Sequence, residues 1–192
     1  MQKMKHDNID RAKKIIRRLI AGSRVPEDAL HAENVLEWVC RLAGSPDEAM
    51  MIAALAHDIE RADEKTKIRR SDFDDYDEFK AAHAENSARI LEKILGKCRV
   101  EPGVVSKACT LVRMHETGGS PEADILKNAD SISFFEVNLP YYFKREGYDE
   151  TLKRCLWGYA RLSSDLRRLF ADFSYSDPAL DMIISCLRGR SV

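Results

Sequence analysis

The chain has 192 residues, of which 44% are hydrophobic and 33% are charged. That composition is typical of one soluble, helix-rich domain and excludes an extensively disordered chain. The net charge is −1, with acidic and basic residues interspersed, so we expect neither an extended nucleic-acid surface nor a membrane-binding one.

Signals of export and of membrane insertion are absent from the sequence. The N-terminal segment has lysines but no apolar run after them, so it does not resemble a secretory signal. The longest strongly apolar run, residues 49–56, is too short to cross a bilayer. The five cysteines are scattered and include no Cys-x-x-Cys pair, which predicts reduced thiols and a cytoplasmic protein.

Helices are predicted over the first third of the chain at about residues 8–21, 26–43 and 46–61. The third has a strong start signal, with Ser45 as N-cap and Pro46 at the first helical position. Its middle, AMMIAALA, is apolar on all sides, so this helix should be the central and most buried one. It carries His57 and Asp58 near its C-terminal end.

Further helices are predicted at about residues 77–95, 102–116, 121–137, 149–170 and from 178 onward. The segments 62–76 and 138–148 between them are expected to be loops near the site, the second because it holds Pro140 and Gly147. Because β-branched residues alternate with polar ones nowhere for long, no strand is expected. We predict an all-α fold, a single compact bundle of about eight helices spanning residues 1–192.

Six nitrogen and oxygen donors lie on apolar faces of the predicted helices: His31, His57, Asp58, His83, His115 and Asp130. Polar groups that point into a core are costly unless something satisfies them, and one shared metal site satisfies all six. No cysteine accompanies them. The donor set therefore favours one or two divalent ions among Mn, Fe, Co, Ni, Zn and Mg over a structural zinc site.

The segment AALAHDIER resembles the HD superfamily of metal-dependent phosphohydrolases, which is named for an adjacent His-Asp pair on a buried helix. The resemblance covers about residues 28–137, and the helices at 149–188 are expected to pack on that core. It matches His31 in HAENVLEWV, the pair His57-Asp58, and Asp130 in LKNADSISFFE to the ligands of one metal. It matches His83 in HAENSARIL and His115 in LVRMHE to the extra ligands of two-metal members.

The resemblance implies that Asp58 bridges two ions. Successive helical residues project about a quarter-turn apart, so His57 can reach one ion while Asp58 spans both. Asp58, Glu60 and Glu116 are the candidate catalytic residues. Of these, Glu60 and Glu116 lie near the donors in the sequence and are candidate acids or bases. Five basic residues are expected near the mouth of the site, where one or two would clamp a phosphate: Arg61, Lys65, Arg69, Arg70 and Lys127. Arg61, Lys65 and Lys127 are the leading candidates.

The function implied is hydrolysis of a small phosphomonoester or phosphodiester, including nucleotides, by metal-activated water. One alternative is a di-iron oxygenase of the same superfamily acting on a small polyol or phosphonate, because the same donors accept iron. A second is a non-catalytic regulatory module. The Gly-Tyr-Pro signature of the cyclic-dinucleotide phosphodiesterases is absent after His115, where the chain reads ETGGSPEAD. A homodimer is a further candidate assembly.

Overall fold

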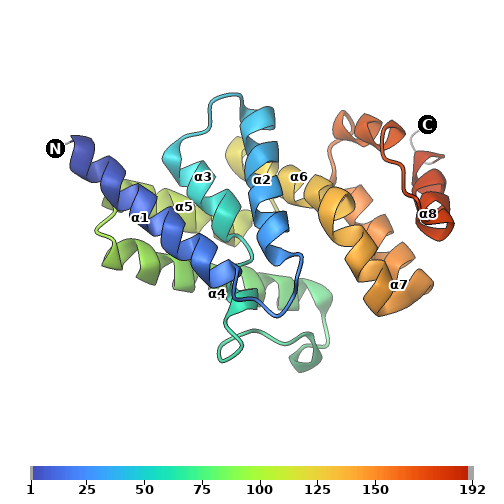
Figure 1. The fold of residues 1–192 in the computed structure, drawn as a ribbon, viewed down its shortest axis with the longest axis horizontal. Coiled ribbons are helices and arrows are strands. Elements are labelled where there is room, and N and C mark those ends of the chain that lie inside the picture. The colour runs from blue at the N-terminus through green and yellow to red at the C-terminus, as the bar shows by residue number, and fades with distance from the viewer. Residues whose placement is uncertain (1, 190–192) are drawn as a thin grey trace.

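The computed structural model describes residues 2–189, and within that range it is all-α with no strand. The N-terminal part contains α1 (Gln2–Ile20), α2 (Asp28–Ala43), α3 (Glu48–Ala56), α4 (Tyr76–Lys97), α5 (Pro102–Met114) and α6 (Pro121–Ser133). The C-terminal part contains α7 (Leu139–Arg161) and α8 (Pro178–Arg188). In Figure 1, α1 to α5 gather on one side, α7 and α8 lie on the other, and α6 runs between them. The prediction of an all-α fold is confirmed.

The central helix α3 is the most buried, as predicted, but it is shorter than expected. Asp47 rather than Ser45 caps it, accepting a hydrogen bond from the backbone N–H of Met50. The α-helix ends at Ala56, and the chain continues as a 3₁₀ turn, η1 (Ile59–Ala62). The expected helix to residue 61 is therefore wrong, and His57 and Asp58 lie at the break between the two elements.

The helix boundaries predicted from capping signals hold well in the middle of the chain. Ser120 caps α6 through the N–H of Ala123, with Pro121 in its first turn, and Asp177 caps α8 in the same manner. The charged segment 62–76 is an irregular connection with a short 3₁₀ turn, η2 (Arg70–Asp72), as the sequence predicted. No helix in the described residues is long and apolar enough to cross a membrane.

The segment 138–148 is not the loop that the sequence predicted. After α6 the chain passes through a π-helical turn, η3 (Phe134–Asn138), and continues directly into α7. Pro140 lies in the first turn of α7, where a missing N–H costs nothing, so it starts a helix instead of breaking one. Only Gly147 departs from helical geometry, with φ 77° and ψ −173°.

The predicted helix at 149–170 also has different limits. Gly147, with its non-helical backbone, divides α7 into two helical pieces, and the second piece begins close to the predicted start at residue 149. It ends at Arg161, short of the predicted limit at residue 170. After that the chain forms a separate 3₁₀ turn, η4 (Leu166–Ala171). The C-terminal segments therefore pack as α7, η4 and α8 instead of one long helix and a short one.

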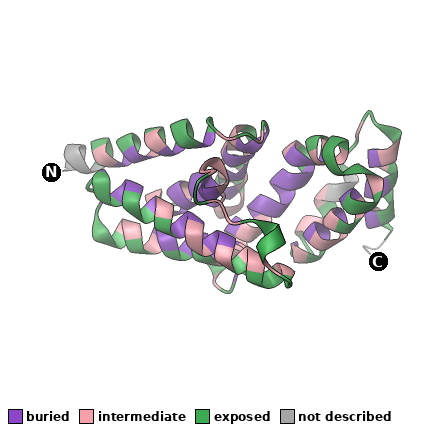
Figure 2. Cartoon of the chain, turned by 90° about the horizontal axis from the view of Figure 1, so that it is seen from below, coloured by how far each residue is buried: buried purple, intermediate pink, exposed green. Residues whose placement is uncertain are grey.

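Two groups of buried apolar side chains hold the fold together. The larger is shared by α1 to α6 and centres on α3, where Ile52 and Leu55 are buried. The smaller joins η3, α7 and α8. Trp38 and Leu42 on α2 pack against both groups, which couples the C-terminal helices to the rest. Figure 2 shows the buried residues on the inward sides of the helices in both halves.

Candidate metal centre

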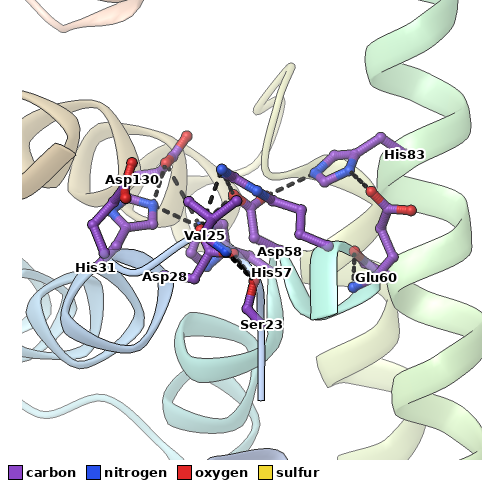
Figure 3. A network of polar contacts seen from close by, with 12 residues as sticks. Ser23, Val25, Asp28, His31, His57, Asp58, Glu60, His83 and Asp130 are labelled. Carbon is purple, nitrogen blue, oxygen red and sulfur yellow. Dashed lines mark hydrogen bonds and ion pairs between the residues drawn. The ribbon is translucent and has the colours of Figure 1, made fainter. Parts of the chain in front are cut away.

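The six predicted donors come together, although they lie on elements far apart in the sequence. They are His31 from α2, His57 and Asp58 from the break after α3, His83 from α4, His115 at the C-terminal end of α5, and Asp130 from α6. Each of the four histidines is at most 3% exposed, and Asp130 is 6% exposed. Figure 3 shows His31, His57 and Asp130 on one side and Asp58 and His83 on the other.

The first donor group consists of His31, His57 and Asp130. The Nε2 atoms of His31 and His57 are 3.2 Å apart. Oδ1 of Asp130 lies 3.2 Å from Nε2 of His31 and 3.6 Å from Nε2 of His57. Donors about 2.1 Å from one ion are separated by about 3.0 to 3.4 Å in octahedral or tetrahedral geometry. The three side chains therefore fit one metal ion with little movement.

The second donor group consists of Asp58, His83 and His115. Oδ1 of Asp58 lies 2.7 Å from Nε2 of His83 and 3.7 Å from Nε2 of His115. The other carboxylate oxygen of Asp58, Oδ2, faces the first group, 3.8 Å from Nε2 of His57. One carboxylate thus offers an oxygen to each group, which is the geometry of a bridge between two ions.

All four imidazoles are held by their Nδ1 atoms, so that Nε2 is the nitrogen turned toward the centre. Nδ1 of His57 and of His115 lie 2.9 and 2.7 Å from the carbonyl oxygens of Ala54 and Val112, which can only accept. Nδ1 of His31 lies 2.8 Å from the Ser133 hydroxyl. Metal-bound histidines in proteins are commonly oriented by such a bond from the other nitrogen. Nε2 of His115 is buried with no hydrogen-bond partner, as expected of a metal ligand.

The charges in the centre also favour a cation. Burial opposes ionisation of Asp58, but the neighbouring His57 and His83 hold its pKa well below the usual value. Burial also disfavours charge on both imidazoles of the first group. It lowers the pKa of His31, whereas Asp58 and Asp130 outweigh it at His57 and raise that pKa to about 9. A cation, either a proton or a metal ion, would hold these two Nε2 atoms and Oδ1 of Asp130 together.

Glu60, a predicted acid or base, lies behind the donors instead of at the centre. Its Oε1 is 2.7 Å from Nδ1 of His83, and its Oε2 accepts hydrogen bonds from the Ile68 N–H and the Asn86 amide. The side chain is therefore fully engaged in orienting His83. Glu60 also lines the cavity, so its role as an acid or base stays a prediction beside its contact with His83.

Glu116, the other predicted acid or base, lies beside the second group, with Oε1 3.2 Å from Nε2 of His115. It also pairs with Lys80 and with Arg161, whose Nη2 is 3.1 Å from Oε2. Burial opposes its charge, but Lys80, His115 and Arg161 lower its pKa strongly. Glu116 is therefore a carboxylate at neutral pH and has no proton to donate as a general acid.

Arg161 on α7 is a site residue that the sequence did not reveal. Its Nη1 donates to Oδ2 of Asp130 at 3.0 Å, and its Nη2 donates to the carbonyl oxygen of His115 at 2.9 Å. The guanidinium thus holds one donor from each group. The sequence carries no signal for this role, since Asp130 and Arg161 are 31 positions apart and the helix predicted there was expected only to pack.

A cavity of about 550 Å³ opens beside the second group, with Asp58 and His83 in its wall. Arg61 also lines it, and its guanidinium contacts Oδ2 of Asp58 at 2.9 Å and Oδ1 of Asp28 at 3.2 Å. The other two leading candidates for phosphate binding are placed elsewhere. Lys65 is exposed on the connection before α4, and Lys127 pairs with Asp124 at 3.2 Å. Arg69 and Arg70 line the cavity as predicted, and Lys67, which the sequence did not single out, lines it as well.

Comparison with curated proteins and with solved structures gives no match. One family model matches residues 4–183, which includes all six donors and Arg161. The match covers far more than half of the chain, and it extends over both the metal-donor helices and most of the C-terminal part. The chain therefore belongs to the family described as a domain of unknown function (DUF4202).

Proposed function

We propose that this protein is a metal-dependent phosphohydrolase of the HD superfamily that acts on a small phosphomonoester or phosphodiester. The observation that carries the proposal is the convergence of four Nε2 atoms and two carboxylates into two groups of donors, with one oxygen of Asp58 directed at each. The order of the donors along the chain, with His57 directly before Asp58, supports placing the protein in that superfamily.

The two donor groups differ in their access to the cavity, and we therefore assign them different roles. Asp58 and His83 line the cavity, whereas His31, His57 and Asp130 are buried behind them. Divalent ions held by these donors supply polarisation of phosphoryl oxygens and lower the pKa of a bound water. A phosphoryl group therefore approaches from the side of His83, and Asp58 fixes the spacing between the two groups.

Arg61 contributes a permanent positive charge at the cavity wall. Burial disfavours that charge, but Asp58 and Asp28 raise the pKa of Arg61 further above its normal value. Its bond to Oδ2 of Asp58 holds the bridging carboxylate in orientation, and its charge offsets part of the negative charge of an arriving phosphate. Arg61 is thus a positioning residue with an electrostatic effect on substrate binding.

The test combines metal analysis with a phosphatase assay. Protein purified without added metal is analysed for bound ions, then stripped with a chelator and assayed with p-nitrophenyl phosphate and bis(p-nitrophenyl) phosphate. We expect Mn²⁺, Ni²⁺, Co²⁺, Fe²⁺, Zn²⁺ or Mg²⁺ to restore cleavage. Asp58→Asn and His83→Asn should lower kcat/KM by roughly a hundredfold or more.

His6→Asn is the matched control for these substitutions, since His6 is an exposed histidine on α1 that pairs only with Asp10. This variant should keep the metal content and the activity of the wild type. A protein that retains no metal and cleaves neither ester with any ion would refute the proposal. Metal binding without cleavage would instead favour the non-catalytic regulatory module.

An iron oxygenase is the second candidate, and the donor chemistry is the observation that favours it. All six donors are imidazoles or carboxylates, a set that binds non-haem iron as well as redox-inert ions. Iron in protein purified without added metal, together with oxygen uptake on addition of a small polyol or phosphonate, would establish this function and displace hydrolysis.

A further inference from the structure

The cavity beside the metal donors is rich in cations, and most of them already have an anionic partner. Arg61 pairs with Asp58 and Asp28, Lys80 with Glu116, and Arg145 with Glu27. At the outer edge, Lys67 lies 3.7 Å from Glu64, while Arg69 and Arg70 are exposed. These charges are either neutralised within the protein or screened by water.

Arg154 on α7 is different from the other cations of the cavity. Its guanidinium carbon lies 4.1 Å from the centre of the Phe134 ring and 4.5 Å from that of Trp157. Nη1 is buried, has no hydrogen-bond partner, and lies where a side chain on Gly158 would touch it. Among the described residues, no carboxylate pairs with Arg154. The fold therefore fixes a planar cation at the cavity wall without a counterion.

Such an arrangement is costly unless a ligand completes it. A partly buried cation loses hydration, and ring contacts replace only part of that loss. The rings also hold the guanidinium in one orientation, so little conformational freedom is lost when an anion binds. An anion bound by Arg154 would provide the missing partner.

Asn138, at the end of the π-helical turn, gives a second and independent indication of a ligand. It lines the same cavity, is only 5% exposed, and its Oδ1 is buried with no hydrogen-bond partner. Phe134, which stacks on Arg154, begins that turn, so one short segment carries both the ring and the unpaired acceptor. π-helical turns inside α-helical runs occur frequently at functional sites.

We propose that Arg154 and Asn138 form a second subsite of the cavity, so that the substrate carries two anionic groups. This inference rests on the proposed function, in which one phosphoryl group lies at the metal donors. The second group, a carboxylate or a phosphate, is bound by the guanidinium of Arg154. A hydroxyl or N–H of the same molecule donates to Oδ1 of Asn138. The substrate class is thus a small phosphoester with a second anionic group and a hydrogen-bond donor near that group.

The experiment measures equilibrium binding of uncleavable analogues by calorimetry, using the manganese-loaded full chain. Alkylphosphonates are compared with phosphonoalkanoates and with alkylene bisphosphonates over a series of chain lengths. At the best length the compound with two anionic groups should bind about tenfold tighter or more than the matching alkylphosphonate, as expected of a charge-assisted bond to arginine. Whether the carboxylate or the second phosphonate is preferred identifies the anion.

Arg154→Met and Arg154→Gln should remove this preference, so that the ratio of the two dissociation constants falls to about one. Lys153→Met is the matched control, because Lys153 is a neighbouring cation on α7 that is exposed and pairs with Glu150. It should keep the preference of the wild type. Circular dichroism of each variant verifies that the helical fold is retained.

Three results would overturn the inference, and only one of them would also refute the proposed function. Equal binding of both analogues to the wild type would refute the second subsite and leave the proposed function standing. A preference that survives in both Arg154 variants would refute the assignment to Arg154. Failure of every phosphonate to bind would refute the proposed function together with the subsite.

Discussion

The side chains that surround the histidines determine how the centre is held. Ala54 and Val112 supply carbonyl oxygens one turn before His57 and His115, so these two imidazoles are oriented by the ends of their own helices. His83 instead depends on the carboxylate of Glu60, a distant residue. Outer contacts of this kind typically change metal affinity by about 10- to 100-fold. The second donor group should therefore be sensitive to Glu60.

Glu60→Gln tests that dependence. The amide still offers an oxygen to Nδ1 of His83, but the charge that strengthens the bond is lost. We expect the affinity of the more weakly held metal ion to fall about tenfold, with the tighter ion retained. Chelator competition followed by metal analysis measures both. If metal affinity is unchanged while turnover is lost, Glu60 acts in the reaction and not in orienting His83.

Arg161→Met tests the link between α7 and the donors. Removing this guanidinium leaves the buried Asp130 without its arginine partner and Glu116 with Lys80 as its remaining basic partner, and breaking such a buried pair commonly costs about 3 to 5 kcal/mol of stability. Both donor groups should lose metal affinity by about tenfold, because Asp130 and the carbonyl of His115 are released together. Chelator competition on folded protein checks this.

Arg168→Met is the control for Arg161→Met, since Arg168 is an exposed arginine that contacts only Asp165, at 3.8 Å. Its metal affinity and its unfolding midpoint should match those of the wild type. Arg161→Lys keeps the positive charge but cannot make both hydrogen bonds of the guanidinium, so it should recover only part of the metal affinity. Equal metal affinity in Arg161→Met and wild type would show that the contacts of α7 do not position the donors.

At the scale of elements, α7 contains one residue whose backbone only glycine adopts readily. Gly147 has φ 77° and ψ −173°, and its carbonyl accepts a hydrogen bond from Thr151. Gly147→Ala should lower the free energy of unfolding by about 1 to 3 kcal/mol because of backbone strain. Gly96→Ala, at an exposed position near the end of α4 with open space around it, should stabilise by up to about 1 kcal/mol. Urea unfolding measures both, and equal effects would contradict the strained geometry.

Local signals explain which elements were predictable. The starts of α6 and α8 follow from Ser120-Pro121 and Asp177-Pro178, and the buried α3 follows from its apolar composition. The segment 138–148 was mispredicted because Pro140 was taken as a helix breaker, whereas a proline in the first turn is compatible with a helix. Gly147 does interrupt α7, as its φ of 77° and ψ of −173° show, and the two helical pieces pack against α8 and η3.

Some residues of the candidate site could be predicted from local patterns, and others could not. Four donors, His31, His83, His115 and Asp130, could be found because helical periodicity places each on an inward face. His57 and Asp58 could be found as an adjacent pair at the end of an apolar segment, although the helix expected there ends before them. Arg161 and Arg154 could not be found, since their roles depend on how α7 crosses the ends of α5 and α6, a tertiary arrangement that no local pattern encodes. Lys65 and Lys127 were chosen by proximity in sequence, and the path of the chain carries both away from the cavity.

At the scale of the whole molecule, the reactivity of the five cysteines tests how the N-terminal and C-terminal parts pack. Cys40 and Cys186 are exposed, whereas Cys98, Cys109 and Cys155 are buried. Burial raises the pKa of Cys155 to about 12 and that of Cys109 to about 11, which keeps both thiols protonated and unreactive. A thiol reagent at pH 8 should modify Cys40 and Cys186 quickly and the other three only after denaturation. Rapid modification of Cys155 in native protein would contradict the packing of α7 against α8.

The candidate metal centre joins side chains from most of the helices, so a change in the stability of the protein on adding metal tests it. Its donors come from α2, α4 and α6 and from the ends of α3 and α5, which the unfolded chain cannot bring together. An ion that binds only the native state adds about 2.7 kcal/mol at a hundredfold excess over its Kd, which raises Tm by roughly 5 to 10 °C for a chain of this size. Thermal unfolding with Mn²⁺ and with chelator measures the difference.

The substitutions His115→Asn and His6→Asn separate a specific site from general ion binding. Among the described residues, Nε2 of His115 makes no hydrogen bond and contacts only the carboxylates of Glu116, at 3.2 Å, and Asp58, at 3.7 Å, so its loss removes a candidate metal ligand and little else. We expect the Tm increase caused by metal to shrink in His115→Asn and to persist in His6→Asn, whose histidine is exposed on α1. An equal increase in Tm in both variants would mean that the stabilising ion binds elsewhere. If the ion binds among the six donors, loss of one donor weakens its binding to the folded state and so reduces the stabilisation.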